Sequence, residues 1–322
     1  MFQVFNQSIA RFHRLAITLL AVFILQVACT PAANGSPAPE QAVTRKLKVV
    51  ATTTILGDIV KQIGKEMIDL RVLLPAGSDP HTFEPTPQDV IAVADADLVL
   101  INGGGLEGFL ERLLENAGAR RVASASQGIA LRNFENDPAA ADSNGDAHSD
   151  PHVWLDPQNV LIWTQNIERE LSDLDPANAE QFATNAEAYR EELRQLDAWI
   201  EEQVSEIPEA NRKLVTDHRT FGYFADRYGF DQVGAIIPSS SAAAEPSANE
   251  MAALEDAIRN AGVKAIFVGT TVSPDLAQRV ATDTGVQLVT LYTDALTDPG
   301  GDAASYLELM RYDVSAIVEA LK

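Results

Sequence analysis

Three histidines and one aspartate stand at positions where α/β proteins commonly bind ligands. His81 and His218 each follow an apolar run with the pattern of a buried strand, and His152 lies in a loop just before a helix. Asp294 comes directly after the last expected strand. Ligands of parallel α/β sheets bind outside the carboxyl ends of the strands. These four residues are therefore the candidates for a shared binding site.

Three imidazoles and one carboxylate are a suitable ligand set for a divalent transition metal. Zn²⁺ accepts four nitrogen and oxygen ligands at about 2.0 to 2.2 Å, and nitrogen-rich sites suit Zn²⁺ better than Mg²⁺ or Ca²⁺. The sequence contains no HExxH motif or close histidine pair that would fix the geometry locally. A single histidine at any one of these positions is more often structural, so the prediction depends on all four together.

Several neighbours could support such a site. Three aspartates precede the histidines by one or two positions and could orient the imidazoles, or they could be ordinary turn residues: Asp79, Asp150 and Asp217. Three aromatic residues could exclude water from the site, or they could be plain core residues: Trp154, Phe221 and Tyr223.

A long helix is expected in the middle of the chain, from Pro176 to about Ile207. Its apolar residues recur at steps of three and four, namely Phe182, Ala186, Tyr189, Leu193, Leu196, Ile200, Val204 and Ile207. Asp175 is the expected N-cap and Pro208 ends the helix. At 1.5 Å per residue it spans roughly 45 Å, which is long enough to join two small domains.

Strands and helices alternate on both sides of this helix. Buried-strand patterns are expected at 47–51, 70–74, the end of 94–101, 213–216, 232–237, 264–268 and 286–292, and the chain closes with a helix over 303–321. This alternation is typical of mostly parallel sheets flanked by helices. We therefore predict an α/β fold with two lobes, 47–174 and 208–322, joined by one long rigid helix over 175–207.

The first 28 residues are expected to be a signal peptide, because two arginines precede a short apolar run, 15–27. Residues 29–46 have the composition of a flexible tether. Cys29 looks like the lipid-modified cysteine of a bacterial lipoprotein, although Gln26 stands where that signal usually has Leu. The alternative is an ordinary cleaved signal. Either way we expect an extracytoplasmic protein, in the periplasm or on the outer face of the membrane.

The composition narrows the class of ligand. A net charge of −22 disfavours nucleic acid and anionic membrane surfaces and is compatible with a cationic ligand, although acidic surfaces also serve solubility. Cys29 is the only cysteine, so no internal disulfide can form and burial must hold the fold together.

Five stretches resemble the metal-binding solute-binding proteins of ABC transporters that carry zinc or manganese: DPHTFEPTPQD, DPHVWLDPQNV, DHRTFGYFADRYG, SPDLAQRVATDTG and LYTDALTDPGGDAASYLELMRYDV. The similarity covers the chain from about Leu47. It implies two α/β lobes joined by a long helix, and its metal ligands match His81, His152, His218 and Asp294. It also implies a monomeric carrier, not an enzyme, that works with an ABC permease and its ATPase.

Zinc is the expected cargo and manganese the alternative. A histidine at the position of His218 is commoner in zinc binders of the family, whereas manganese binders often have Glu there. Many zinc members carry a His-rich loop where this chain has the short acidic segment 135–150, which holds only His148. We therefore expect a solvated loop without a metal-gathering role. Glu245 could pair with the transporter or be a solvated charge.

Three other functions compete with the metal carrier. A zinc hydrolase would need Asp294 to act as a base, with water as the fourth ligand. A carrier of an iron chelate or corrinoid would need a wide cleft but no histidine cluster. A surface adhesin, a label often given to this family, is compatible with metal transport. Metal binding should weaken in acid, because imidazoles coordinate only when neutral and their unperturbed pKa is about 6.5.

Overall fold

The computed structural model describes residues 45–322 except 110–112, 115–116, 134–148 and 238–245. The expected signal peptide, Cys29, His148 and Glu245 lie outside the described residues. From Lys46 to Lys322 the chain forms one compact unit. Among the described residues, no helix is both long and apolar enough to span a bilayer.

The N-terminal lobe is built on a four-stranded parallel sheet with the order β2-β1-β3-β4. Its strands are β1 (Leu47–Ala51), β2 (Ile68–Val72), β3 (Leu98–Ile101) and β4 (Val122–Ser124). The α-helices of this part of the chain that lie wholly within the described residues are α2 (Thr54–Gly64), α3 (Pro87–Asp95) and α5 (Pro157–Leu174). Strand β4 was not predicted from the sequence, because it has three residues and no fully buried side chain.

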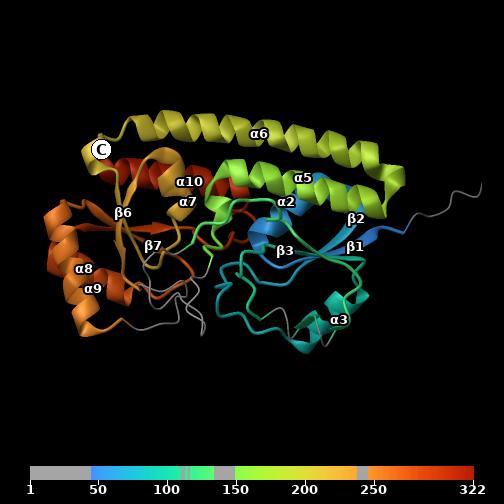
Figure 1. Cartoon of the computed structure of the whole chain (residues 1–322), viewed down its shortest axis with the longest axis horizontal. Coiled ribbons are helices and arrows are strands. Elements are labelled where there is room, and N and C mark those ends of the chain that lie inside the picture. Colours follow the sequence, from blue (N-terminus) through green and yellow to red (C-terminus); the bar gives the residue numbers. More distant parts are fainter. Residues whose placement is uncertain (1–44, 110–112, 115–116, 134–148, 238–245) are drawn as a thin grey trace, which may run out of the picture. The chain divides into compact units, whose positions relative to one another are not determined.

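The C-terminal lobe repeats the plan with a parallel sheet of order β6-β5-β7-β8. Its strands are β5 (Lys213–Thr216), β6 (Asp231–Ala235), β7 (Ala265–Gly269) and β8 (Gln287–Leu291). Its helices are α7 (Gly222–Tyr228), α8 (Ala248–Ala261), α9 (Asp275–Thr284) and α10 (Tyr306–Leu321). The two lobes, each with a parallel sheet covered by helices, confirm the predicted fold class (Figure 1).

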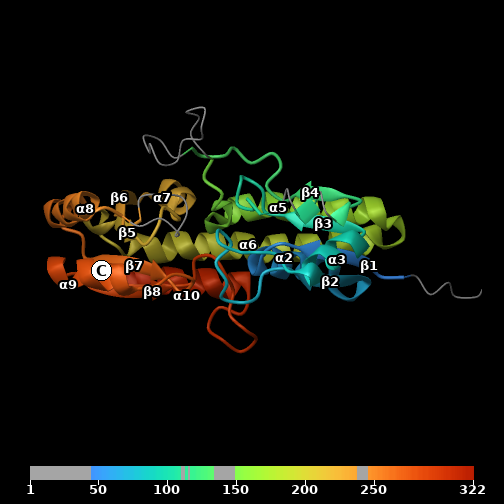
Figure 2. The same ribbon diagram turned by 90° about the horizontal axis from the view of Figure 1, so that it is seen from below.

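The long helix α6 (Ala179–Ser205) runs beside both lobes (Figures 1 and 2). Near its start, Asn185 donates to the backbone carbonyl of Ile63 at the end of α2. Further along, Asp197 accepts hydrogen bonds from Gln158 on α5 and from Tyr228 on α7. The helix is therefore tied to both lobes by polar contacts as well as by its apolar stripe.

The helix begins three residues later than the sequence predicted. Pro176–Asn178 form a separate 3-10 turn, and Asn178 occupies the N-cap position of α6. The carboxylate of Asp175 accepts a hydrogen bond from the side chain of Asn178 at 2.6 Å. Asp175 therefore stabilises the turn instead of capping the long helix.

One hydrophobic core extends through both lobes. It includes Leu56 of α2, Phe182 and Leu193 of α6, Phe224 of α7 and Ile317 of α10, all buried. Opening the lobes widely would expose part of this core to water, which is unfavourable in proportion to the apolar area exposed. The packing therefore favours small relative movements of the lobes.

Candidate metal centre

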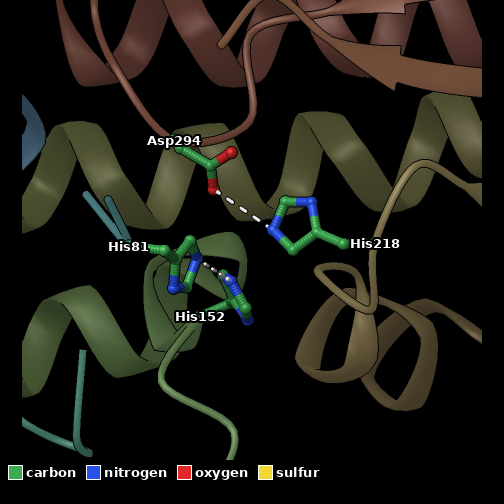
Figure 3. A group of neighbouring side chains, drawn as sticks. All are labelled: His81, His152, His218 and Asp294. Carbon is green, nitrogen blue, oxygen red and sulfur yellow. Dashed lines mark hydrogen bonds and ion pairs between the residues drawn. The ribbon is translucent and has the colours of Figure 1, made fainter. Parts of the chain in front are cut away.

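Four loops bring the predicted site residues together between the lobes (Figure 3). His81 lies in the segment between β2 and α3, and His152 lies just before a 3-10 turn, 153–155, that leads into α5. His218 follows β5 and Asp294 follows β8. One ligand atom from each residue lies within 4.8 Å of the others. Each lobe contributes two of the four side chains.

The cluster is almost fully enclosed by protein. His152 and His218 are 0% exposed and Asp294 is 2% exposed, whereas His81 is partly exposed. The Nε2 atoms of His81 and His152 are 3.2 Å apart, and His218 Nε2 is 3.9 Å from Asp294 Oδ1. Figure 3 shows all four groups directed at one small volume. Three imidazole nitrogens and a carboxylate oxygen gathered this closely suit a single shared cation.

Aspartates orient two of the three imidazoles. Asp150 Oδ1 lies 2.8 Å from His152 Nδ1, and Asp217 Oδ1 lies 2.9 Å from His218 Nδ1. A carboxylate beside Nδ1 favours the tautomer with the proton on that nitrogen, which leaves Nε2 free to bind a metal. Asp150 and Asp217 are thus the orienting acceptors that the sequence suggested.

Asp79 has a different role, although it has the same two-residue offset as Asp150. Its Oδ1 accepts the backbone N–H of His81 at 2.8 Å, and its Oδ2 accepts the hydroxyl of Thr82 at 3.0 Å. Asp79 therefore shapes the turn that carries His81 and does not contact the imidazole. Burial raises the pKa of this carboxyl.

The two carboxylate oxygens of Asp294 differ: Oδ1 faces the histidines, and Oδ2 is held by neighbouring hydroxyls. Oδ2 accepts hydrogen bonds from the hydroxyls of Thr293 at 2.7 Å and Thr271 at 3.1 Å. Oδ1 is buried and has no hydrogen-bond partner among the described residues. Because a buried carboxylate oxygen without a partner is costly, a cation bound at Oδ1 would relieve a real energetic penalty.

The surroundings shift the pKa values of two histidines in opposite directions. Burial, together with the charge of His152, lowers the pKa of His81 to about 3. Burial alone would also lower the pKa of His218, but Asp217 and Asp294 raise it to about 9. Burial opposes ionisation of Asp294, yet His218 and the other imidazoles lower its pKa. At neutral pH without metal, the site is expected to hold an imidazolium–carboxylate pair.

These shifts correct the simple pH expectation from sequence. His81 and His218 are not expected to take up protons together near pH 6.5, because the pKa of His81 is lowered to about 3 and that of His218 is raised to about 9. Competition between protons and metal should therefore begin in the alkaline range, at His218.

Of the three predicted aromatic residues, Trp154 packs against a histidine of the site. The Trp154 ring lies 5.3 Å from the His152 ring, and its Nε1 donates to the carbonyl of Thr293 on the opposite lobe at 2.9 Å. Phe221 and Tyr223 are buried. Trp154 therefore both excludes water from His152 and links the loops that carry His152 and Asp294.

Three threonines at the site were not predicted from the sequence. Thr271 and Thr293 hold Asp294, and the hydroxyl of Thr220 lies 3.0 Å from His218 Nε2. Each follows the carboxyl end of a strand in its lobe, as the candidate ligands do. Their position after a strand could have indicated a role at the site, but threonine is too common near strand ends for this position alone to be informative.

Comparisons with known proteins identify the family of this chain. A family model described as "Zinc-uptake complex component A periplasmic" matches residues 49–320. The chain is 36% identical over 276 residues to a manganese-binding lipoprotein of Halalkalibacterium halodurans, which covers 85% of this chain and 88% of the relative.

Two solved structures share the fold. A Mn-bound periplasmic metal-binding protein from Candidatus Liberibacter asiaticus is 29% identical, covers 86% of this chain and 100% of its own, and has a TM-score of 0.77. A periplasmic zinc-binding protein from Treponema pallidum is 28% identical, covers 86% of this chain and 99% of its own, and also has a TM-score of 0.77. The chain therefore belongs to this family of metal-binding proteins, the substrate-binding components of ABC transporters, which are not enzymes.

Proposed function

We propose that this protein captures one divalent cation, preferably zinc, outside the cytoplasmic membrane and delivers it to an ABC permease powered by its ATPase. The ligands would be His81, His152, His218 and Asp294. The convergence of three imidazoles on the unpartnered Oδ1 of Asp294 is the observation that carries this proposal.

Zinc is favoured over manganese by the chemistry of the donors. Three of the four groups offer nitrogen, which suits zinc, whereas manganese is better served by oxygen-rich sites. Manganese is the second candidate, because the relative from Halalkalibacterium halodurans is named a manganese-binding lipoprotein. Both metals would occupy the same four side chains.

We further propose that Cys29 carries a lipid that holds a monomeric protein at the outer face of the membrane. The support for an anchor is the relatives named as lipoproteins, which include the one from Halalkalibacterium halodurans. Mass spectrometry of the membrane-extracted protein tests it. A diacylglycerol adduct at Cys29 supports anchoring, and a mature chain that begins after an ordinary cleavage site contradicts it.

A competition titration with Zn²⁺ and Mn²⁺ tests the choice of metal. We expect one equivalent of zinc to bind and excess manganese to leave it in place. His218→Ala should abolish tight binding, whereas His218→Glu should raise the affinity for manganese relative to zinc, because an oxygen ligand replaces a nitrogen. His148→Ala is the control for losing a histidine and should change neither affinity. Preferential manganese binding by the wild-type protein would overturn the choice of zinc.

A further inference from the structure

A tyrosine of the C-terminal lobe contacts the loop that carries His152. Tyr223 lies in the first turn of α7 and is 6% exposed. Its hydroxyl donates to the backbone carbonyl of Asp150 at 2.9 Å and accepts the backbone N–H of Arg132 at 2.9 Å. Both partners belong to the segments between β4 and α5 in the other lobe. The hydroxyl therefore fixes two backbone groups across the boundary between lobes.

The segment that Tyr223 contacts contains Asp150, which orients the candidate ligand His152. Asp150 N–H donates to the carbonyl of Arg132 at 2.7 Å, so the two residues form a local pair. Asp150 Oδ1 in turn accepts from the backbone N–H of His152 at 3.0 Å and lies 2.8 Å from its Nδ1. Asp150 thus links Tyr223, which bonds its backbone carbonyl, to His152, which pairs with its carboxylate.

Two further contacts reinforce this arrangement. The guanidinium of Arg132 donates to the carbonyl of Gly222 and forms an ion pair with Asp226, both in the C-terminal lobe. A Cβ atom at Gly222 would lie 2.5 Å from Asp150 Oδ2, so the close approach of α7 to Asp150 depends on glycine at this position. Asp150 and its partner Arg132 therefore lie against several groups of α7, and not against Tyr223 alone.

We propose that Tyr223 is a positioning residue that slows release of the bound metal, because its hydroxyl holds the Asp150–His152 pair in place from the opposite lobe. This inference rests on the proposed function and adds to it a means of release. Separating the lobes would break the contact of Tyr223 with Asp150 and free His152 to turn away from the metal. A permease that pulls the lobes apart would thereby lower the affinity of the site.

The test compares two tyrosines of the same helix. Tyr223→Phe keeps the ring and removes the hydroxyl. Tyr228→Phe does the same at a residue that is also 6% exposed, but whose hydroxyl donates to Asp197 on α6 at 2.7 Å. Zn²⁺-loaded wild-type and variant proteins are mixed with excess chelator, and the rate of zinc release is followed by stopped flow. Chemical denaturation of the metal-free proteins gives their stability.

Tyr223→Phe should release zinc about tenfold faster, as expected when a residue that supports a metal ligand is lost. Tyr228→Phe should lower stability and leave the release rate within twofold of wild type. In an Asp150→Ala background, adding Tyr223→Phe should have little further effect, because the link to His152 is already broken. Gly222→Ala, which pushes on Asp150 directly, should also speed release.

The outcomes separate this inference from the proposed function. Stoichiometric zinc binding with unchanged release in Tyr223→Phe and Gly222→Ala overturns the role of Tyr223 alone. Equal acceleration by Tyr223→Phe and Tyr228→Phe also overturns it, because the effect would then follow stability and not position. A wild-type protein that binds neither zinc nor manganese overturns the proposed function, and this inference with it.

Discussion

Raising the pH from 7 to 9 should strengthen metal binding by about fiftyfold, because His218 must lose a proton before its Nε2 can coordinate. The carboxylates of Asp217 and Asp294 raise the pKa of His218 to about 9 despite its burial. Two pH units below that value, only about 1% of the imidazole is neutral, which costs about 2.7 kcal/mol of binding free energy. His81, with a pKa of about 3, adds nothing in this range.

Chelator competition at constant ionic strength, with the chelator's own protonation taken into account, measures this dependence. The logarithm of the affinity should rise by about one unit per pH unit near pH 7, more slowly as the pH approaches 9, and level off above it. Calorimetry in buffers of different ionisation enthalpy should show about one proton released per ion at pH 7. Asp217→Asn, which removes one of the charges that raise the pKa, should reduce the proton release at pH 7 to 9. A flat affinity over this range, with no proton released, would refute the argument.

Two predictions concern stability in the metal-free protein. Burial raises the pKa of Asp313 to about 8, and its Oδ2 has no partner among the described residues. The unfolded chain ionises this group near pH 3.8, so wild-type stability should fall as pH rises from about 4 to 8, and Asp313→Asn should recover about 4 kcal/mol at pH 7. Denaturant titrations at pH 4 and 7 check this, and an equal effect at both would contradict it. Leu193→Ala should lower the free energy of unfolding by about 2–5 kcal/mol. The variant should still unfold in one cooperative transition, because Leu193 lies in the core that spans both lobes. Two separate unfolding transitions, followed by circular dichroism, would argue against a shared core.

The sequence predicted the architecture because the fold depends on periodic patterns. The apolar stripe of α6 and the buried strand patterns are properties of neighbouring residues, and the structure confirms two lobes beside one long helix. Boundaries were less predictable. Asp175 and Pro176 look like a helix start, yet a side-chain hydrogen bond to Asn178 closes a separate turn first. β4 is too short to show any periodicity.

Spacing suggested three aspartates that could support the imidazoles but could not show which of them do. Asp79 and Asp150 stand at the same offset from a histidine, but only Asp150 reaches an imidazole, because the two loops follow different backbone paths. The roles of the unpartnered Oδ1 of Asp294 and of the hydroxyl of Tyr223 depend on contacts with residues far away in the chain. Such long-range contacts leave no local pattern in the sequence.

Anomalous diffraction from crystals of the zinc-loaded protein, collected on both sides of the zinc absorption edge, tests the central claim most directly. We expect one strong anomalous peak at bonding distance, about 2.0 to 2.2 Å, from Nε2 of His81, His152 and His218 and from an oxygen of Asp294. The peak should vanish in crystals of His218→Ala prepared in the same way. A zinc peak at any other place in the molecule, or none at these four side chains, would contradict the account.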